Sequence, residues 1–499
     1  MTTMTTMTTM TTMTSATERS DMSGHRVRQR IIHVVGAALR LTWQVGMIVV
    51  VTGCSLDSLL KSDELPPEVI DPAITRTPAG ALDAYHGTLA QFRNGAGGLG
   101  PGSLLMVGGL LGDELQSGGE EFGEATSGVD TRVIESTDPS VAYAYSGVHR
   151  VRGQSIQAIG LLTRYAPGRE ALAGHLYALQ GYAEIFLAEL FCSGSPLSTI
   201  DFDGDFTPRP GSTTREVFEH SLALFDSARA LAGDSARFVQ LARGGEARAL
   251  LALGEFAEAA AAAAQVENGY SYAVSFSAAT GTDALNFAYI QSGTLWPFTV
   301  ADREGLNGLD YRTSGDPRTR VTARGTSEHG FTLYHPNKYA TNGSSPIVIA
   351  SGVEARLIEA EAALDAGSGT WLERLNALRT DGTFTTRPND TDPERTDTLW
   401  RAGIGEVAGL APLGDPGNEE ARVDLLFRER AFWLFLTGHR QGDLRRLIRQ
   451  YGRAPEQVYP SGPYFGIGGA NYGSDVTLPI PPAEQVSNPH FTGCASRGA

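Results

Sequence analysis

The residues best suited to chemistry lie close together near the C-terminus, in the stretch RERAFWLFLTGHRQGDLRRLIRQYG, which runs from Arg428 to Gly452. His439 and Asp443 are four residues apart, about one helical turn, and six arginines surround them. A hydrolase would need a nucleophile or a metal ion beside His439. The sequence contains no GxSxG motif, no HExxH motif and no ligand-spaced His cluster. We therefore predict that Glu429, His439 and Asp443 pair with neighbouring polar groups inside the protein, without catalysis, cofactor or metal.

The charge balance argues against nucleic acid as a partner. The chain has 40 Lys and Arg against 56 Asp and Glu, a net charge of −16. Phosphate binding needs several cations on one exposed surface, so we expect no nucleic-acid partner. With 41% hydrophobic residues, the chain can bury a large core.

The N-terminal region has the pattern of an exported lipoprotein. A low-complexity start, MTTMTTMTTMTTM, is followed by several arginines, the short apolar run LTWQVGMIVVV and then TGC. A cationic segment, about ten apolar residues and small residues before a cleavage point are typical of a signal peptide, and the run is too short to span a bilayer. VTGC, which ends at Cys54, resembles the bacterial lipobox. We expect a leader over residues 1–53, a lipid anchor on Cys54, a tether over 54–77 and one domain over 78–499. A buried helix is the alternative interpretation of the apolar run.

Two cysteines remain after Cys54, namely Cys192 and Cys494. In an exported protein such a pair favours a disulfide, with two unpaired thiols as the alternative. Because no histidine lies at ligand spacing from them, they do not indicate a metal site.

Helical patterns dominate the rest of the chain. Thr77 and Pro78 are a typical N-cap and first helical residue. Asn94–Gly109 is rich in glycine and is expected to be a loop. Apolar spacing predicts helices at about 141–165, 169–191 and 215–231, and helix pairs of tetratricopeptide type at 235–266 and 351–379. The region of about 268–345 is predicted to be irregular, and loops of that length are often functional.

Five segments, in order, carry a resemblance to a known family. They are GDELQSGG near Asp113, YALQGYAEIFLAELFCSGSPLS, ARLIEAEAAL, FRERAFWLFLTGHRQGDLRR and LPIPPAEQVSNP. Together they resemble SusD/RagB-like outer-membrane lipoproteins. The resemblance implies an all-α fold of tetratricopeptide-like helix pairs with long irregular loops. It also implies that the C-terminal motif locks a helix pair into the core through Glu429, Arg430, His439, Arg440, Asp443 and Arg445.

The resemblance further implies capture without catalysis. Such proteins lie on the cell surface, anchored to the outer membrane, and pass a glycan or another nutrient to a SusC-like TonB-dependent transporter. Two alternatives remain, a tetratricopeptide-type lipoprotein scaffold for envelope assembly and a surface glycosidase. A glycosidase would need two carboxylates roughly 5 to 10 Å apart in a cleft.

Aromatic residues in the irregular region are the expected ligand contacts, because a flat ring can cover the apolar face of a sugar. The preferred pair is Trp296 and Tyr311, which lie beside turn-forming residues that would present them outward. The other residues expected to contribute are Asn307, Asp310 and Tyr334, with Phe298, Asn337 and Tyr339 as further members of the same region.

Overall fold

The computed structural model describes residues 75–98, 102–117, 128–201, 203–277, 279, 284–287, 298–327, 330–339, 342–380, 410–465 and 470–499. The expected leader, the lipidation site at Cys54, nearly all of the tether and Trp296 lie outside these residues. Among the helices of the described ranges, none combines the length and the apolar character needed to cross a membrane.

The N-terminal helices begin as the sequence predicts. In α4 (Pro78–Gly97) the Thr77 hydroxyl accepts a hydrogen bond from the amide of Gly80, and Pro78 occupies the first turn. The helices that follow agree closely with the predicted ranges. They are α7 (Pro139–Tyr165), α8 (Glu170–Leu190), α9 (Thr214–Leu231), α10 (Ala236–Leu253), α11 (Phe256–Ala263), α13 (Gly352–Asp365) and α14 (Thr370–Thr380).

The glycine-rich segment differs from the prediction. It was expected to be a loop from Asn94 to Gly109, but α4 continues to Gly97, and Leu104–Leu111 forms helix α5. All eight side chains of α5 are buried. Burial of the sequence LLMVGGLL therefore outweighs the low helix propensity of its two glycines.

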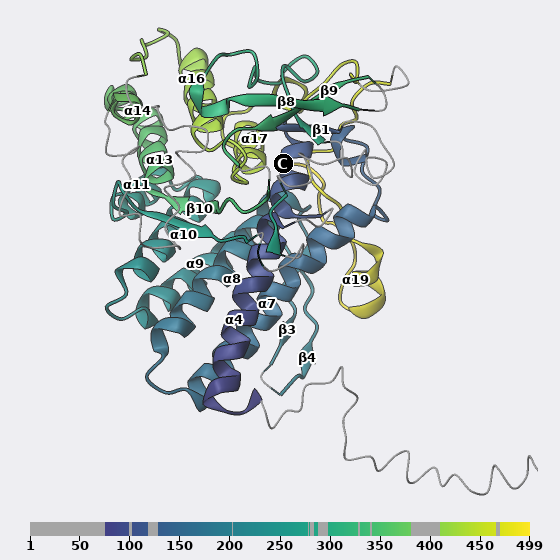
Figure 1. Ribbon diagram of the computed structural model, residues 1–499, viewed down its shortest axis with the longest axis vertical. Coiled ribbons are helices and arrows are strands. Elements are labelled where there is room, and N and C mark those ends of the chain that lie inside the picture. The colour runs from purple at the N-terminus through teal and green to yellow at the C-terminus, as the bar shows by residue number, and fades with distance from the viewer. Residues whose placement is uncertain are drawn as a thin grey trace, which may run out of the picture. The chain divides into compact units, whose positions relative to one another are not determined.

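Successive helices pack side by side (Figure 1). Helix α8 lies at the centre and contacts α7, α9 and α10. The predicted pairs α10/α11 and α13/α14 are present and pack together through α11 and α13. Close approach of α8, α9 and α10 depends on small residues, since a Cβ added at Gly181 or Gly245 would lie 2.7 or 2.2 Å from the ring of Phe225.

The C-terminal helices are α16 (Glu419–Trp433), α17 (Arg440–Arg449), α18 (Pro455–Val458) and α19 (Pro482–Ser487). The turn between α16 and α17 contains Leu436 (φ 52°) and Gly438 (φ 78°), both in the left-handed region. This turn separates the two helices. Leu436 keeps its unfavourable backbone conformation because its amide donates to Glu114 and its carbonyl accepts from the Tyr339 hydroxyl.

The strands are short and form two-stranded antiparallel pairs. The pairs are β1 (Leu115–Ser117) with β7 (Phe298–Val300), β2 (Ser195–Pro196) with β5 (Gly211–Ser212), β3 (Thr199–Ile200) with β4 (Phe206–Thr207), β6 (Ser271–Val274) with β10 (Ile347–Ser351), and β8 (Val321–Thr326) with β9 (Thr332–Pro336). The region predicted to be irregular therefore contains β6 to β9 and the short 3₁₀ helix η2 (Pro317–Thr319). The fold is helical, with tetratricopeptide-like pairs, as expected.

A disulfide joins the end of α8 to the C-terminal segment. Cys192 and Cys494, the pair expected from the sequence, are bonded, with their Cα atoms 5.8 Å apart. Backbone hydrogen bonds from Cys192 to Leu478 and from Ser193 to Ser496 hold the same two segments together. The last residues of the chain are thereby fixed against the central helix.

Candidate functional site

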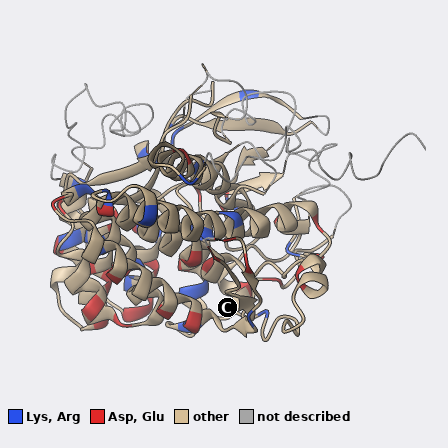
Figure 2. Cartoon of the chain, turned by 90° about the horizontal axis from the view of Figure 1, so that it is seen from below, with Lys and Arg blue, Asp and Glu red and all other residues tan. Residues whose placement is uncertain are grey.

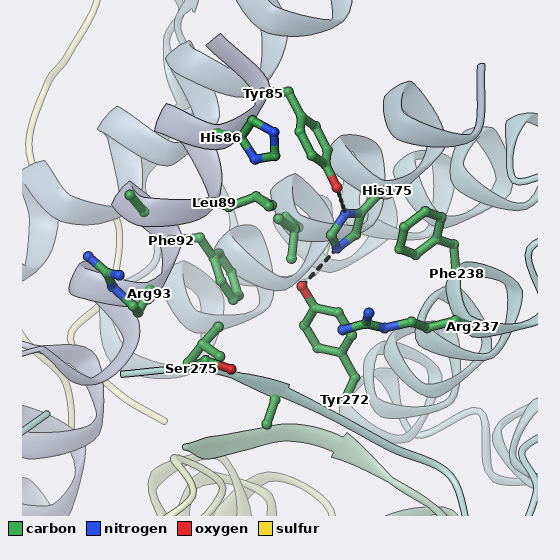
Figure 3. A pocket seen from close by; sticks show the side chains of 14 residues that line it. Tyr85, His86, Leu89, Phe92, Arg93, His175, Arg237, Phe238, Tyr272 and Ser275 are labelled. Atoms are coloured by element: carbon green, nitrogen blue, oxygen red, sulfur yellow. Dashed lines mark hydrogen bonds between the residues drawn. The ribbon is translucent and has the colours of Figure 1, made fainter. Parts of the chain in front are cut away.

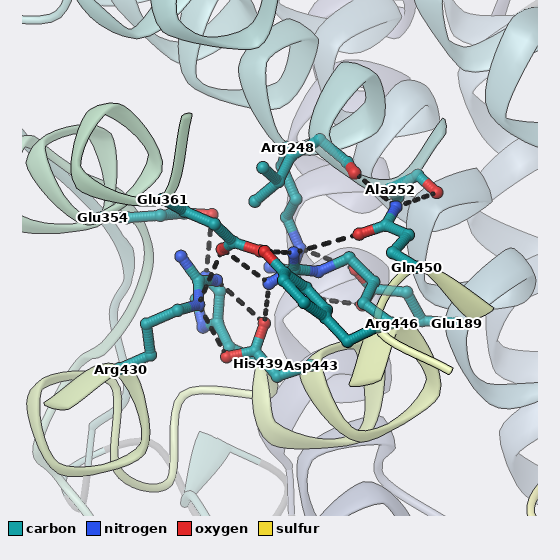
Figure 4. Close-up of polar contacts among 12 residues, drawn as sticks. Glu189, Arg248, Ala252, Glu354, Glu361, Arg430, His439, Asp443, Arg446 and Gln450 are labelled. Atoms are coloured by element: carbon teal, nitrogen blue, oxygen red, sulfur yellow. Dashed lines mark hydrogen bonds and ion pairs between the residues drawn. The ribbon is translucent and has the colours of Figure 1, made fainter. Parts of the chain in front are cut away.

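The C-terminal motif forms a buried network of charges (Figure 4). Both oxygens of Asp443 accept from Arg430 at 2.8 Å, and Arg446 donates to the same carboxylate at 2.8 Å. Glu361 of α13 accepts from Arg446 at 3.0 Å. These side chains are at most 3% exposed. Although burial raises the pKa of Asp443, the two guanidinium groups bring it well below its ordinary value.

The other residues of the motif also bind within the protein. His439 Nε2 lies 3.0 Å from Glu354 Oε1, so its partner is a carboxylate of α13. Glu429 accepts from Arg318 and Arg379 at 2.7 Å. Arg445 donates to the carbonyls of Ala188 and Phe191 on and just beyond α8.

The segment GDELQSGG, which contains Asp113 and Glu114, contacts the C-terminal motif. Arg440 donates to both oxygens of Asp113, at 2.6 and 2.8 Å, and Glu114 accepts from the amide of Leu436 at 2.6 Å. Burial is the main reason why the pKa of Glu114 rises to about 8. Two motifs more than 300 residues apart therefore form one structural unit.

The prediction of Tyr311 as an outward-facing ligand contact is wrong. Its side chain is 1% exposed. The ring stacks on Phe432 with centroids 5.5 Å apart, and its hydroxyl donates to Asp113 at 3.3 Å. The neighbouring turn residues do not present the ring to solvent, because α16 covers it. Phe298 and Tyr339 are buried as well.

The other predicted contacts have partners inside the fold. Asn307 donates to the Tyr459 carbonyl at 3.0 Å and the Ser461 hydroxyl at 2.9 Å, so it fixes a turn after α18. Asp310 pairs with Arg428 at 2.6 Å. The ring of Tyr334 lies under the guanidinium of Arg312. The side-chain oxygen of Asn337 accepts a hydrogen bond from the Thr322 hydroxyl. Trp296 lies outside the described residues, and the described members of this set do not gather into a site.

A hollow of about 340 Å³ offers a better candidate (Figure 3). It lies between α4, α8, α10 and β6. Its lining consists of Tyr85, His86, Leu89, Ala90, Phe92, Arg93, His175, Leu179, Arg237, Phe238, Tyr272, Ala273, Val274 and Ser275. Its volume is at the lower end of the range of small-molecule sites, roughly 300 to 1,000 Å³, and rings and aliphatic side chains surround a few polar groups, as such sites require.

His175 organises this hollow. Its Nδ1 lies 2.8 Å from the Tyr85 hydroxyl, and its Nε2 lies 2.7 Å from the Tyr272 hydroxyl. The imidazole stacks on Phe238 with centroids 4.2 Å apart. Burial, with a smaller contribution from Arg237, lowers the pKa of His175 to about 3, so the ring is neutral near pH 7. A neutral ring donates through one nitrogen and accepts at the other, which fixes both tyrosine hydroxyls.

The charged residues of the lining are of one sign. Arg93 and Arg237 lie on opposite sides of the hollow in Figure 3, and His86 lies on α4 beside Tyr85. The described lining contains no Asp or Glu. Elsewhere acidic and basic positions are intermixed along the helices (Figure 2). Within the described residues, no three His, Cys, Asp or Glu side chains gather in a way that suits a metal ion.

A second hollow, of about 950 Å³, lies where the α13–α14 turn meets the start of α16 and the end of α17. Its charged residues largely bind one another. Arg422 donates to both oxygens of Asp415 at 2.8 Å, and Arg453 donates to Glu420. Because both arginines of this hollow already pair with its carboxylates, the hollow beside His175 remains the candidate site.

Sequence reasoning did not identify this site. Tyr85, His175, Arg237 and Tyr272 were not singled out as ligand contacts. They come from four elements that span about 190 residues of sequence, and no spacing along the chain connects them.

No protein-family model matches the sequence, and none of the curated proteins resembles it closely enough to match. Solved structures do match. A SusD-like carbohydrate-binding protein from Bacteroides vulgatus is 15% identical, with 83% of this chain and 97% of that chain covered and a TM-score of 0.57. A SusD superfamily protein from the same species has 15% identity, coverage of 85% and 100%, and a TM-score of 0.59. NanU of B. fragilis has 14% identity, coverage of 87% and 100%, and a TM-score of 0.56. The chain therefore has the fold of the SusD-like proteins.

Proposed function

We propose that this chain is a carbohydrate-capture protein without catalytic activity, which binds its ligand in the hollow beside His175. The observation that carries the proposal is the SusD-like fold, which the chain shares with a SusD-like carbohydrate-binding protein. The hollow supports it chemically, since Phe238 supplies a half-buried ring surface and the Tyr85 and Tyr272 hydroxyls supply hydrogen-bonding groups.

The wider role belongs to the same proposal. A lipid on Cys54 would hold the protein at the outer-membrane surface, and a SusC-like TonB-dependent transporter would receive the captured ligand. The sequence VTGC after an apolar run supports the anchor. A gene for such a transporter next to the gene for this protein would support the proposed partnership.

The two alternatives receive less support. The described lining of the hollow lacks the carboxylate pair that a glycosidase needs. An envelope scaffold would use the helix pairs but would have no need of a hollow with ordered tyrosine hydroxyls. Sugar binding distinguishes the proposal from the scaffold.

A glycan array tests the proposal directly. The full chain carrying Cys54→Ala, which prevents lipidation, is applied to the array, and the affinity for the best ligand is then measured by calorimetry. Phe238→Ala should weaken binding about tenfold or more, or about 1.4 kcal/mol, because it removes the half-buried ring that stacks on His175. Phe256→Ala, which removes a partly buried ring on α11 outside the hollow, is the matched control. If the protein bound no glycan on the array, the proposed function would be contradicted. If Phe238→Ala and Phe256→Ala bound the ligand equally well, the proposed position of the site would be contradicted.

A further inference from the structure

The charges that line the hollow bear on which carbohydrates it accepts, an inference that rests on the proposed function. Arg93 of α4 and Arg237 of α10 lie on opposite sides of the hollow; Arg237 extends toward Tyr272, and the Arg93 guanidinium lies at the outer edge (Figure 3). The lining thus holds two guanidinium groups and no described carboxylate, although the net charge of the chain is −16. A neutral sugar does not require them.

Arg93 is the more informative of the two. Its Nε donates to the Asn94 side chain at 3.1 Å, and its guanidinium lies 5.9 Å from the centroid of Phe276. It makes no ion pair with any described residue of the chain, and partial burial lowers its pKa without an offsetting carboxylate. A guanidinium nonetheless stays protonated. A partly desolvated cation of this kind is stabilised when an anion binds beside it.

The neutral residues of the hollow leave this positive charge unopposed. His175 is uncharged near pH 7, and the Tyr85 and Tyr272 hydroxyls are held by its ring nitrogens. Arg237 lies over the face of Tyr272, with its guanidinium carbon 5.2 Å from the ring centroid. The planar fork of an arginine matches a carboxylate, to which it can donate two parallel hydrogen bonds.

We propose that the hollow selects acidic carbohydrates, in which a sugar carboxylate binds Arg93 while the sugar ring lies against the aromatic side chains. The carboxylate is the distinguishing group, because a neutral sugar of the same ring shape offers Arg93 only hydroxyl oxygens. A guanidinium–hydroxyl bond lacks both the attraction between opposite charges and the paired parallel hydrogen bonds of a guanidinium–carboxylate contact.

Matched ligands test this inference. Calorimetry on the full chain with Cys54→Ala compares uronic-acid oligosaccharides with neutral ones of equal length, namely galacturonate with galactose, glucuronate with glucose, and mannuronate with mannose oligomers. We expect at least one acidic member to bind tenfold or more tighter than its neutral partner. The preference should shrink as salt rises from about 0.05 to 0.5 M, because mobile ions screen a partly exposed pair.

Variants assign the preference to Arg93. Arg93→Gln should lower the affinity for the acidic ligand about tenfold and leave the neutral ligand within about twofold, and Arg93→Lys should restore part of the loss, because it returns the charge without the planar fork. Arg150→Gln removes an exposed charge on α7 outside the hollow and should change neither affinity. Equal or tighter binding of the neutral oligomers, or an unchanged preference in Arg93→Gln, would overturn the inference alone. Failure of every oligosaccharide, acidic and neutral, would overturn it together with the proposed function.

Discussion

Asp443→Asn should destabilise the protein severely. The wild-type carboxylate is 3% exposed and accepts three hydrogen bonds at 2.8 Å from Arg430 and Arg446. Asparagine has the same shape, but its amide group would face a guanidinium, and the two arginines would share only Glu361. Removing one partner from a buried ion pair costs about 3–5 kcal/mol, because it leaves a buried charge uncompensated. That loss is a large part of the roughly 5–15 kcal/mol that typical domains possess.

Urea unfolding followed by tryptophan fluorescence measures this loss, since Trp433 is buried at the end of α16. The matched control is Asp415→Asn. Asp415 binds Arg422 with two hydrogen bonds at 2.8 Å, but its side chain is 41% exposed, so solvent screens this pair and its loss should change the stability far less. If the two variants lost equal stability, burial would not be the reason for the effect.

The pH dependence gives the prediction a second readout. The pKa of Asp443 is depressed in the folded state, so its contribution is fully present above the unfolded pKa, near 4, and is lost as the pH falls through the folded value. The difference between wild type and Asp443→Asn should therefore be constant from about pH 5 upward and shrink only below about pH 4. A difference that shrank between pH 5 and 8 would refute the assignment to this carboxylate.

Two further predictions concern the cysteines. Cells fed a labelled fatty acid should incorporate the label into the wild-type protein and not into Cys54→Ala. Equal labelling of both proteins would contradict a lipid anchor on Cys54. Thiol titration of denatured, unreduced Cys54→Ala protein should find no free thiol, because Cys192 and Cys494 are bonded, and two thiols after reduction. The disulfide closes a loop with a sequence separation of 302 residues, which is expected to stabilise the folded protein by up to about 5 kcal/mol. Reduction should therefore also lower the urea midpoint. Two reactive thiols before reduction would contradict the disulfide.

Local sequence signals predicted the helices well, because a helix depends largely on its own caps and apolar spacing. Thr77 with Pro78, and the many small residues of α10 and α11, are examples. The same reasoning placed Asp443 beside Arg446, three residues away on α17. It did not supply Glu361 or Glu354 as partners, because these lie on α13, some 80 residues earlier.

The loss of helical spacing in the region of 268–345 was mistaken for exposure. The sequence around Tyr311 has no periodic pattern of apolar residues. Phe432 and Phe435, which lie more than 100 residues later in the chain, nevertheless pack on its ring and bury it. Spacing reports which face of an element is apolar and does not report what another element places against it. The glycine-rich α5 shows the opposite error, since burial made a helix where propensity indicated a loop.

Helix α8 connects the candidate site to the structural network. His175 lies near one end of the helix, while Glu189, which pairs with Arg248 at 2.6 Å, and the disulfide at Cys192 lie at the other. The 14 residues between His175 and Glu189 correspond to about 21 Å along the axis. At that distance the described lining of the hollow includes no residue of the network, so a substitution there removes no contact of the hollow. The buried pairs and the disulfide instead act by holding α8 rigid, which lowers the entropic cost of ordering His175 and its two tyrosines around a ligand. Substitutions in the network should therefore lower stability while the ligand preference of the folded protein stays the same.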